Sequence, residues 1–249
     1  MARFHVRPEA IRGSRVRLDP EEVHHIHRVR RLGPGDVVEL LDGAGNHYQV
    51  RLESVTAEGM EGIILTSSRS SSESPLACTL VQAVPKGEKM EWIIQKATEL
   101  GVVRIVPLLT ARTVVQLSPP RASGKLRRWQ RVAREAAKQA GRGVIPAIER
   151  PVSLAEFLRA PGPADVALCL WEGAREPLGR LLDQARGPVR AVTLLVGPEG
   201  GWAAAEVAQI RAHGILTTGL GPRILRTESA AIAGLALLQF RLGDLGGPA

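Results

Sequence analysis

Residues 194–240 decide the fold, and they read LLVGPEGGWAAAEVAQIRAHGILTTGLGPRILRTESAAIAGLALLQF. An apolar run at 192–196 ends abruptly in the glycine-rich segment 197–201. A second apolar run, 215–220, ends in Gly221-Pro222 and leads into Arg223-Ile224-Leu225-Arg226-Thr227-Glu228-Ser229. Each run is typical of a strand that enters a glycine-containing loop and then a helix. Glycines allow a backbone to approach a ligand closely and to adopt conformations that other residues resist.

The two loops predict a ligand site. In open parallel sheets, ligands bind just beyond the carboxyl ends of the strands. The polar groups of the second loop, Arg226, Thr227 and Glu228, would then lie beside the ligand. The first loop lacks the lysine of a phosphate-binding loop, so backbone groups around an uncharged purine and an amino-acid tail fit better. The sequence has no G-x-G-x-x-G after its first strand, no Walker A motif and no G-x-S-x-G elbow.

The net charge of +8 over 249 residues indicates a polyanionic partner, most simply nucleic acid. The alternative is a soluble enzyme from a GC-rich genome that favours Arg over Lys. Arginines are crowded near the start of the chain, where few acids accompany them, and together they are typical of a phosphate-contacting surface. They are Arg3, Arg7, Arg12, Arg15, Arg17, Arg28, Arg30 and Arg31.

Residues 1–70 are predicted to form a small β-rich module. Asp19-Pro20-Glu21-Glu22 is a helix start, and 37–41 and 47–55 are strands joined at the Asp42-Gly43 turn, followed by a short strand at 62–65. The serine-rich run 66–74, TSSRSSSES, is typical of a linker, and we expect the domain boundary there.

From residue 75 onward, strand and helix patterns alternate, which predicts an α/β domain with a parallel sheet covered on both faces. The expected strands are 76–84, 102–108, 165–170, 191–196 and 216–220, and the expected helices are 90–100, 125–141, 177–185, 204–213 and 227–242. On helix 125–141 the charged face indicates either a solvated basic surface or, at Glu135, Gln139 and Arg142, side chains aimed at a site.

Cys78 and Cys169 both lie in apolar runs, so we expect buried free thiols in a reducing compartment. His24, His25 and His27 share a short helix without a ligand set at zinc spacing, so no metal is expected. No leader and no apolar run of membrane-spanning length are evident, which favours a cytoplasmic protein without a membrane partner.

Four motifs, LVGPEGGW, LGPRILRTES, KGEKMEWIIQKATELGV and REAAKQAGR, together resemble the SPOUT superfamily of knotted methyltransferases, and within it the 16S ribosomal RNA uridine N3-methyltransferases. The similarity extends to the amino-terminal HHIHRVRRLGPGD and therefore covers nearly the whole chain. GPEGG followed by LGPRILRTE is its most specific part.

The resemblance implies a SPOUT-type parallel sheet at 71–249 with a deep trefoil knot at about 194–240, preceded by a PUA-like RNA-binding β-barrel at 1–70. It implies S-adenosyl-L-methionine as cofactor, 16S ribosomal RNA in the decoding-region helix of the small subunit as substrate, and a homodimer. The cofactor-binding residues would be Leu170, Leu195, Gly197, Gly200, Gly201, Leu220, Gly221, Ile224 and Leu225. The RNA-binding residues would be Arg3, Arg7, Arg12, Arg30, Arg31, Lys86, Lys89, Arg112, Arg134, Glu135, Gln139 and Arg142.

For such a reaction, Arg226 is expected to stabilise the anion at uridine N3, and Glu228 to accept the proton or orient Arg226, with Thr227 beside them. The alternative for Glu228 is a carboxylate that only stabilises a helix start. Ala203 stands where the family has Ser or Thr, which predicts a lost helix cap. Two other functions remain open: a SPOUT methyltransferase acting on another base or a ribose 2′-hydroxyl of ribosomal or transfer RNA, and a non-catalytic RNA-binding assembly factor.

Overall fold

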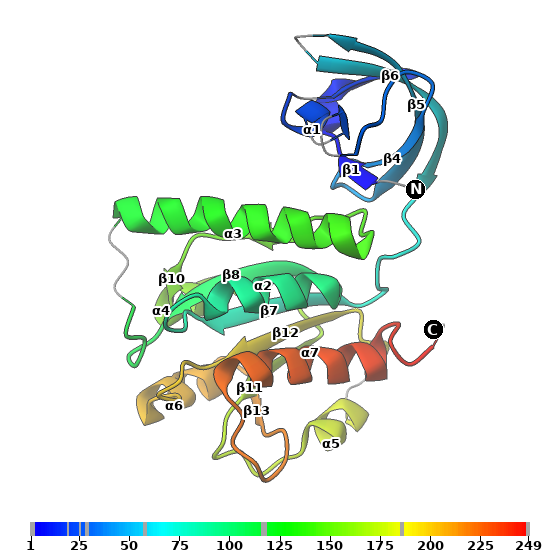
Figure 1. Ribbon diagram of the computed structural model, residues 1–249. Coiled ribbons are helices and arrows are strands. Elements are labelled where there is room, and N and C mark those ends of the chain that lie inside the picture. Colours follow the sequence, from blue (N-terminus) through cyan, green and yellow to red (C-terminus); the bar gives the residue numbers. More distant parts are fainter. Residues whose placement is uncertain are drawn as a thin grey trace. The chain divides into compact units, whose positions relative to one another are not determined.

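The computed structural model describes residues 3–18, 20–24, 26–27, 30–56, 59–115, 119–184 and 187–247. The chain divides into two compact units, and each is described by itself (Figure 1). Unit 1 comprises Met1–Glu73 together with Ala137–Ile145, and unit 2 comprises Ser74–Ala136 together with Pro146–Ala249. The predicted domain bounds, 1–70 and 71–249, remain a prediction. The two units are divided differently, because unit 1 also includes Ala137–Ile145.

Unit 1 is built on a curled sheet in the strand order β1-β4-β5-β6-β3-β2, in which β1 and β4 are parallel and the other pairs antiparallel. A single 3-10 turn, η1 (Pro8–Ala10), and the short helix α1 (Pro20–His24) accompany the sheet. Its strands are β1 (Arg3–His5), β2 (Ile11–Arg12), β3 (Arg15–Leu18), β4 (Val37–Leu41), β5 (Asn46–Thr56) and β6 (Gly59–Arg69).

The core of unit 1 consists of Phe4, Met60 and aliphatic side chains, and Ile26 is fully buried in it. Asp19, the first residue of the predicted helix start, lies outside the described residues. The hairpin between β4 and β5 turns at Asp42, whose carboxylate accepts hydrogen bonds from the backbone N–H groups of Ala44 and Asn46 at 2.8 and 3.0 Å.

The serine-rich run is not a linker throughout. Residues 66–69 belong to β6 and pair with β5, from Gln49 opposite Thr66 to Asn46 opposite Arg69. The side chains of these four residues are exposed, so the run lacks the apolar alternation that marks a half-buried strand. The pairing comes from backbone hydrogen bonds, which a polar sequence supports as well as an apolar one.

Residues 141–145 also belong to unit 1, where they pair with the β4–β5 hairpin. The backbone N–H of Gly45 donates to the carbonyl oxygen of Gly143 at 2.9 Å. Beside it, Arg142 is only 2% exposed, and its guanidinium contacts the Glu73 carboxylate at 2.7 Å. The segment is therefore held by backbone pairing and by a partly buried ion pair.

Unit 2 is organised around a parallel sheet in the order β10-β8-β7-β12-β11-β13, with β9 also paired to β8. The strands are β7 (Ala77–Ala83), β8 (Val102–Leu109), β9 (Ala147–Ile148), β10 (Val152–Ser153), β11 (Val166–Leu170), β12 (Ala191–Val196) and β13 (Leu216–Thr218). The prediction of a parallel sheet is confirmed.

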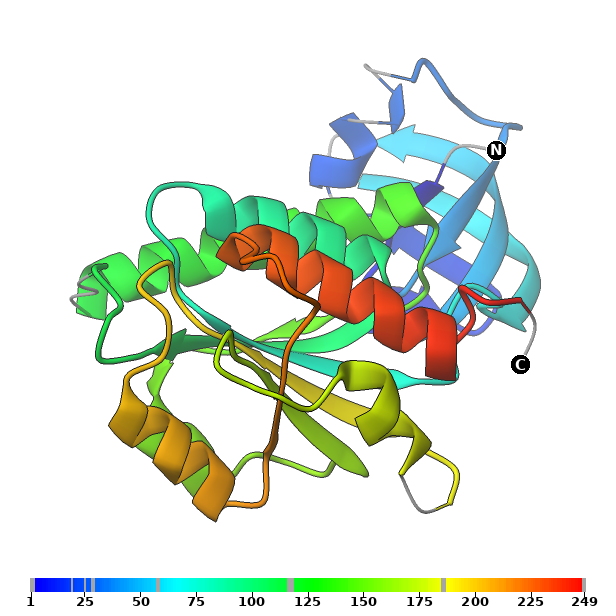
Figure 2. The same ribbon diagram turned by 90° about the horizontal axis from the view of Figure 1, so that it is seen from below.

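Helices cover both faces of this sheet (Figure 2). On one face, α2 and α7 pack against each other and against the central strands. On the other, α4 and α6 join a core cluster with Val81, Cys169 and Leu195. The helices are α2 (Lys89–Glu99), α3 (Pro119–Ala140), α4 (Leu154–Arg159), α5 (Leu178–Asp183), α6 (Ala204–Ala212) and α7 (Thr227–Leu242).

Both cysteines are free and buried, as predicted. Burial raises the pKa of the Cys78 thiol to about 12, and it raises the pKa of Cys169 as well. Both side chains therefore behave as small apolar groups of the sheet rather than as nucleophiles.

Candidate functional site

Three loops at the carboxyl ends of neighbouring strands enclose a cavity of about 620 Å³. We refer to residues 171–177 after β11 as the β11 loop, to 197–203 after β12 as the β12 loop, and to 219–226 after β13 as the β13 loop. Because β12, β11 and β13 are adjacent and parallel, these loops emerge at the same edge of the sheet. The cavity lies where the two glycine loops were predicted to hold a ligand.

Two glycines of the β12 loop, Gly197 and Gly201, are required by its geometry. Gly201 has φ +69° and closes a turn by donating its N–H to the carbonyl oxygen of Pro198 at 2.9 Å. A Cβ on Gly201 would lie 2.8 Å from Oε1 of Glu172. A Cβ on Gly197 would lie 2.9 Å from Nε1 of Trp202. Neither position can carry a side chain without a rearrangement of the cavity wall.

Trp202 anchors the end of the β12 loop. Its side chain is buried with Cys169 and Leu195, and Nε1 donates a 2.9 Å hydrogen bond to the carbonyl oxygen of Leu170. That carbonyl lies at the end of β11, so the indole joins two of the three loops. The next residue, Ala203, has no capping side chain, as predicted, but its N–H donates to Oε2 of Glu206 at 2.9 Å.

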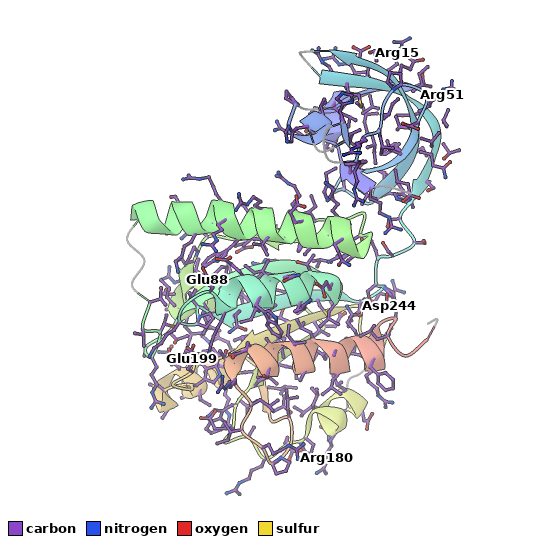
Figure 3. All side chains as sticks on the ribbon, in the orientation of Figure 1. Arg15, Arg51, Glu88, Arg180, Glu199 and Asp244 are labelled. Atoms are coloured by element: carbon purple, nitrogen blue, oxygen red, sulfur yellow. The ribbon has the colours of Figure 1, made fainter. Side chains whose placement is uncertain are left out.

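Three basic residues donate hydrogen bonds to the β12 loop. Figure 3 labels Glu199 near the end of unit 2 at which α7 begins. Oε1 of Glu199 accepts from the backbone N–H of Lys86 at 3.1 Å and from Nζ of Lys89 at 3.3 Å. Nη1 of Arg112 donates to the carbonyl oxygen of Gly200 at 2.7 Å. Burial alone would raise the pKa of Glu199, but hydrogen bonds from backbone N–H groups and from Lys89 outweigh it and lower that pKa.

Lys89 lies between two carboxylates. Its Nζ is 3.3 Å from Oε1 of Glu199 and 3.2 Å from Oε2 of Glu228, so one ammonium joins the β12 loop to the first turn of α7. The contact with Glu228, and then that with Glu199, raises the pKa of Lys89. The carboxylate of Glu228 is thereby held beside the cavity.

The β13 loop presents arginines at the cavity and then enters α7. Gly221 has φ +97°, and Ile224 is 86% exposed. Arg226 is the extended residue before α7, and its exposed side chain borders the cavity together with that of Arg223. Of the predicted trio, Arg226 and Thr227 line the cavity, whereas Glu228 does not and instead contacts the lining residue Lys89.

Thr227 is turned inward. Its Oγ1 donates to the carbonyl oxygen of Gly197 at 2.6 Å and accepts from Nε2 of Gln82 at 2.9 Å. Its hydroxyl therefore joins the start of α7 to the β12 loop.

Most of the predicted cofactor-binding residues border the cavity, namely Leu170, Gly197, Gly200, Gly201, Leu220, Gly221, Ile224 and Leu225. Leu195 does not border it, because its side chain is fully buried among α4 and α6. Trp171, Glu172 and Trp202 also line the cavity, and sequence reasoning missed them. For these three residues, the one signal in the sequence was Trp202, the last residue of the motif LVGPEGGW.

The predicted RNA-binding residues fall into three groups. Lys86, Lys89 and Arg112 support the β12 loop as described. In unit 1, Arg3 pairs with Glu39 at 3.0 Å, and Arg142 is buried against Glu73, so its guanidinium is not presented to solvent. The remaining predicted residues are exposed, namely Arg7, Arg12, Arg30, Arg31, Arg134, Glu135 and Gln139.

Within the described ranges, no group of three or more His, Cys, Asp and Glu side chains could hold a metal ion. His25, one member of the histidine cluster, lies outside those ranges. No helix in the described part of the chain is both long and apolar enough to cross a membrane.

Two family models match this chain, one of an RNA methyltransferase domain at residues 72–239 and one of an RNA methyltransferase PUA domain at residues 18–65. A protein named ribosomal RNA small subunit methyltransferase E from Synechocystis sp. is 38% identical over 96% of this chain and 78% of its own. The protein of the same name from Bacillus subtilis is 34% identical over 89% of this chain and 88% of its own.

A solved structure agrees with these sequence relationships. The crystal structure of a ribosomal RNA small subunit methyltransferase E from Neisseria gonorrhoeae bound to S-adenosyl methionine has 34% identity and a TM-score of 0.87, and it covers 98% of this chain and 99% of that one. The parallel sheet and the curled sheet match that SPOUT-type architecture with its PUA-like domain. The chain therefore belongs to the RNA methyltransferase family with an amino-terminal PUA domain.

Proposed function

We propose that this protein transfers a methyl group from S-adenosyl-L-methionine to N3 of a uridine in the 16S ribosomal RNA of the small subunit. The observation that carries the proposal is the cavity formed by the β11, β12 and β13 loops, with Arg226 and Thr227 in its lining and Glu228 ion-paired to the lining residue Lys89. The relatives named for methylation of small-subunit ribosomal RNA, one of them crystallised with the cofactor, support the same function.

The residues of the cavity suit S-adenosyl-L-methionine. A volume of about 620 Å³ falls within the usual range of small-molecule sites, and the lining combines apolar side chains with glycine backbone. Leu170 and Leu225 offer apolar surface for an adenine ring, and the backbone of Gly197 and Gly201 offers donors and acceptors for its polar edge and the amino-acid tail. When bound, the cofactor supplies a methyl group activated by a positively charged sulfonium.

Uridine N3 must lose its proton, and the resulting charge spreads onto O2 and O4. In this proposal Arg226 stabilises that charge; it is supported by the position of Arg226 in the cavity lining and at the N-cap of α7. Glu228 is the proton acceptor or the group that orients Arg226, and Lys89 holds it in position. Orientation of N3 toward the methyl group supplies the rest of the rate enhancement.

The target base normally lies in a structured RNA and must be exposed before it reacts. Exposed arginines of the amino-terminal domain, residues 1–70, would contact phosphates, among them Arg7, Arg12, Arg30 and Arg31, while residues 71–249 carry the chemistry. Arg134, Glu135 and Gln139 on α3 would contact RNA as well. The net charge of +8 supports an RNA partner, and it resides in residues 71–249, because residues 1–70 hold ten Arg and ten Asp or Glu.

The proposal includes a homodimer, with the β12 to α7 segment at about 194–240 threaded as a trefoil knot. On α7, Leu237 and Phe240 lie three residues apart and share one exposed face, and Trp92 is exposed on the neighbouring α2. Exposed apolar groups on two packed helices favour burial against a second copy.

We place the protein in the cytoplasm, where its buried thiols would stay reduced.

The test uses the full chain with methyl-labelled S-adenosyl-L-methionine and small ribosomal subunits that lack the modification. Nucleoside digestion and mass analysis should yield labelled 3-methyluridine. A label on another base or on a ribose 2′-hydroxyl would assign the protein to a different modification. Cofactor binding without transfer to subunits, naked ribosomal RNA or transfer RNA would favour an assembly factor, and absence of cofactor binding would contradict the proposal altogether.

A further inference from the structure

Gln82 is a fully buried amide next to the cofactor cavity that the proposed chemistry does not use. It occupies the penultimate position of β7, and its Cα pairs in register with Val196, which borders the cavity. A buried primary amide is unfavourable unless its polar atoms find partners. The hydrogen-bond partners of the Gln82 amide therefore indicate its role in the structure.

The direction of the hydrogen bonds is fixed by Thr227. A threonine hydroxyl has one hydrogen, and here it goes to the carbonyl oxygen of Gly197 at 2.6 Å. The 2.9 Å contact between Gln82 and Thr227 must then be a donation from Nε2 of Gln82. The second hydrogen of the same Nε2 goes to the carbonyl oxygen of Ala83 at 2.9 Å. Both amide hydrogens are therefore used.

The resulting chain of donors joins three segments that are far apart in sequence. It runs from β7 through the first residue of α7 to the β12 loop. A Cβ added to Gly197 would lie 2.9 Å from Nε1 of Trp202. Gly197 is thus contacted at its carbonyl by the Thr227 hydroxyl and has the indole close to its Cα.

Stability alone does not explain an amide at this position. Oε1 of Gln82 is buried and has no hydrogen-bond partner in the described structure. Uncompensated acceptors of this kind are rare in protein interiors. An apolar side chain of similar length would avoid the unpaired oxygen, so the donor at Nε2 is the feature worth retaining.

We propose that Gln82 is a positioning residue for the cofactor site: through Thr227 it fixes the Gly197 carbonyl, and so pre-organises the β12 loop to bind S-adenosyl-L-methionine. The inference rests on the proposed function, because the cavity must bind that cofactor. Gln82 acts through Thr227 and touches neither the cofactor nor the RNA. Its loss should raise the dissociation constant and the KM for the cofactor more than it lowers kcat.

The test compares two matched substitutions in the full chain. Gln82→Met removes the donor and the unpaired acceptor together, and Gln239→Met replaces another fully buried glutamine, which bonds Leu100 and Ser74 at the far end of α7. Calorimetry should show about tenfold weaker cofactor binding for Gln82→Met, with only a small fall in Tm, because removal of the unpaired Oε1 offsets the loss of the two donated hydrogen bonds. Gln239→Met should lower Tm and leave cofactor affinity unchanged.

A third variant, Thr227→Val, interrupts the same chain of hydrogen bonds. Gln82→Met and Thr227→Val interrupt the same chain of hydrogen bonds from Gln82 through Thr227 to Gly197. The double variant should therefore bind the cofactor no more weakly than Thr227→Val alone. Multiplying effects, or unchanged affinity in Gln82→Met, would overturn the assignment. A wild-type protein that fails to bind the cofactor would instead overturn the proposed function, so the two failures are distinguishable.

Discussion

Nε1 of Trp202 donates a 2.9 Å hydrogen bond to the carbonyl oxygen of Leu170. The bond joins the end of the β12 loop to the end of β11, and both residues border the cavity. One indole therefore sets the separation of two walls of the site. Since the donor and acceptor are both buried, the bond matters for stability as well as for shape.

Trp202→Phe keeps an aromatic ring in the core, removes the donor and leaves a small cavity where the rest of the indole was. The buried carbonyl of Leu170 loses its partner, which should destabilise the protein by about 1–3 kcal/mol. Denaturant unfolding measures that loss, and calorimetry should show weaker cofactor binding. Unchanged stability and affinity would mean that the contact contributes to neither.

Adjacent glycines of the β12 loop should differ in their tolerance of alanine. Gly201→Ala places a Cβ at φ +69° and 2.8 Å from Glu172, and left-handed backbone alone costs about 1–2 kcal/mol for an L-residue. The matched variant Gly200→Ala meets only the Arg112 side chain at 3.3 Å. We expect loss of cofactor binding in the first and near-normal binding in the second. Equal behaviour would show that the turn adapts.

Arg226→Ala should separate chemistry from binding. Removal of a preorganised charge that stabilises a transition state lowers kcat by about 10²–10³-fold. Cofactor affinity should stay near that of the wild type, and Arg223→Ala, which alters the neighbouring exposed arginine of the same loop, should change turnover far less. Single-turnover methylation of small subunits and calorimetry provide the two readouts. A collapse of cofactor affinity would instead make Arg226 part of the cofactor site.

Phe240→Asp should convert the proposed dimer to a monomer. Phe240 is 63% exposed on α7, and a carboxylate there would have to be desolvated in an interface of two copies. Sedimentation equilibrium should give twice the chain mass of 26.8 kDa for the wild type and the single mass for the variant. Leu216→Asp, at an exposed leucine of the edge strand β13, is the control and should remain dimeric. A monomeric wild type would refute the proposed assembly.

Asp42 should make unit 1 sensitive to acid. Burial alone would raise its pKa, but hydrogen bonds from Asn46, Ala44 and Tyr48 outweigh it and lower that pKa. A lowered folded pKa stabilises the protein fully above the unfolded value of about 3.9, and this contribution is lost as pH falls through the folded value.

Asp42→Asn tests that dependence, because the new amide faces the Asn46 side-chain donor that contacts Oδ2 at 2.6 Å. We expect a loss of about 1–3 kcal/mol at pH 7 that shrinks below pH 4, measured by denaturant unfolding. A loss independent of pH would assign the effect to packing.

The alternation of strands and helices in unit 2 was predictable because each buried strand is a short apolar run that ends at a glycine or a polar loop. The glycine-containing segments that end two of these apolar runs also located the β12 and β13 loops. Residues 226–228 were predicted at the site because they stand at the end of the second of these segments. Gln82 was not predictable, since it sits in an apolar run and its partner Thr227 is 145 residues away in sequence. A local pattern carries no signal for such a contact.

Charge patterns gave the weakest predictions for a similar reason. Arg142 was predicted to be aimed at a site and to bind RNA, with a solvated basic face as the alternative, yet its partner Glu73 lies 69 residues earlier and the pair is formed inside unit 1. At Ala203, the absence of a capping side chain was predicted, but the carboxylate of Glu206 accepts the free N–H. Both outcomes depend on where a distant or neighbouring carboxylate is placed in three dimensions.

The membership of Ala137–Ile145 in unit 1 has a practical consequence for dissecting the protein. No single break in the polypeptide separates the two units, because the first unit is assembled from two stretches of chain. A fragment expressed from residue 74 onward would retain Arg142 without Glu73 and would leave Gly143 without the hairpin that it pairs with. Such a truncation would leave an unmatched charge and an unpaired edge, and poor solubility of the product would say nothing about the catalytic half.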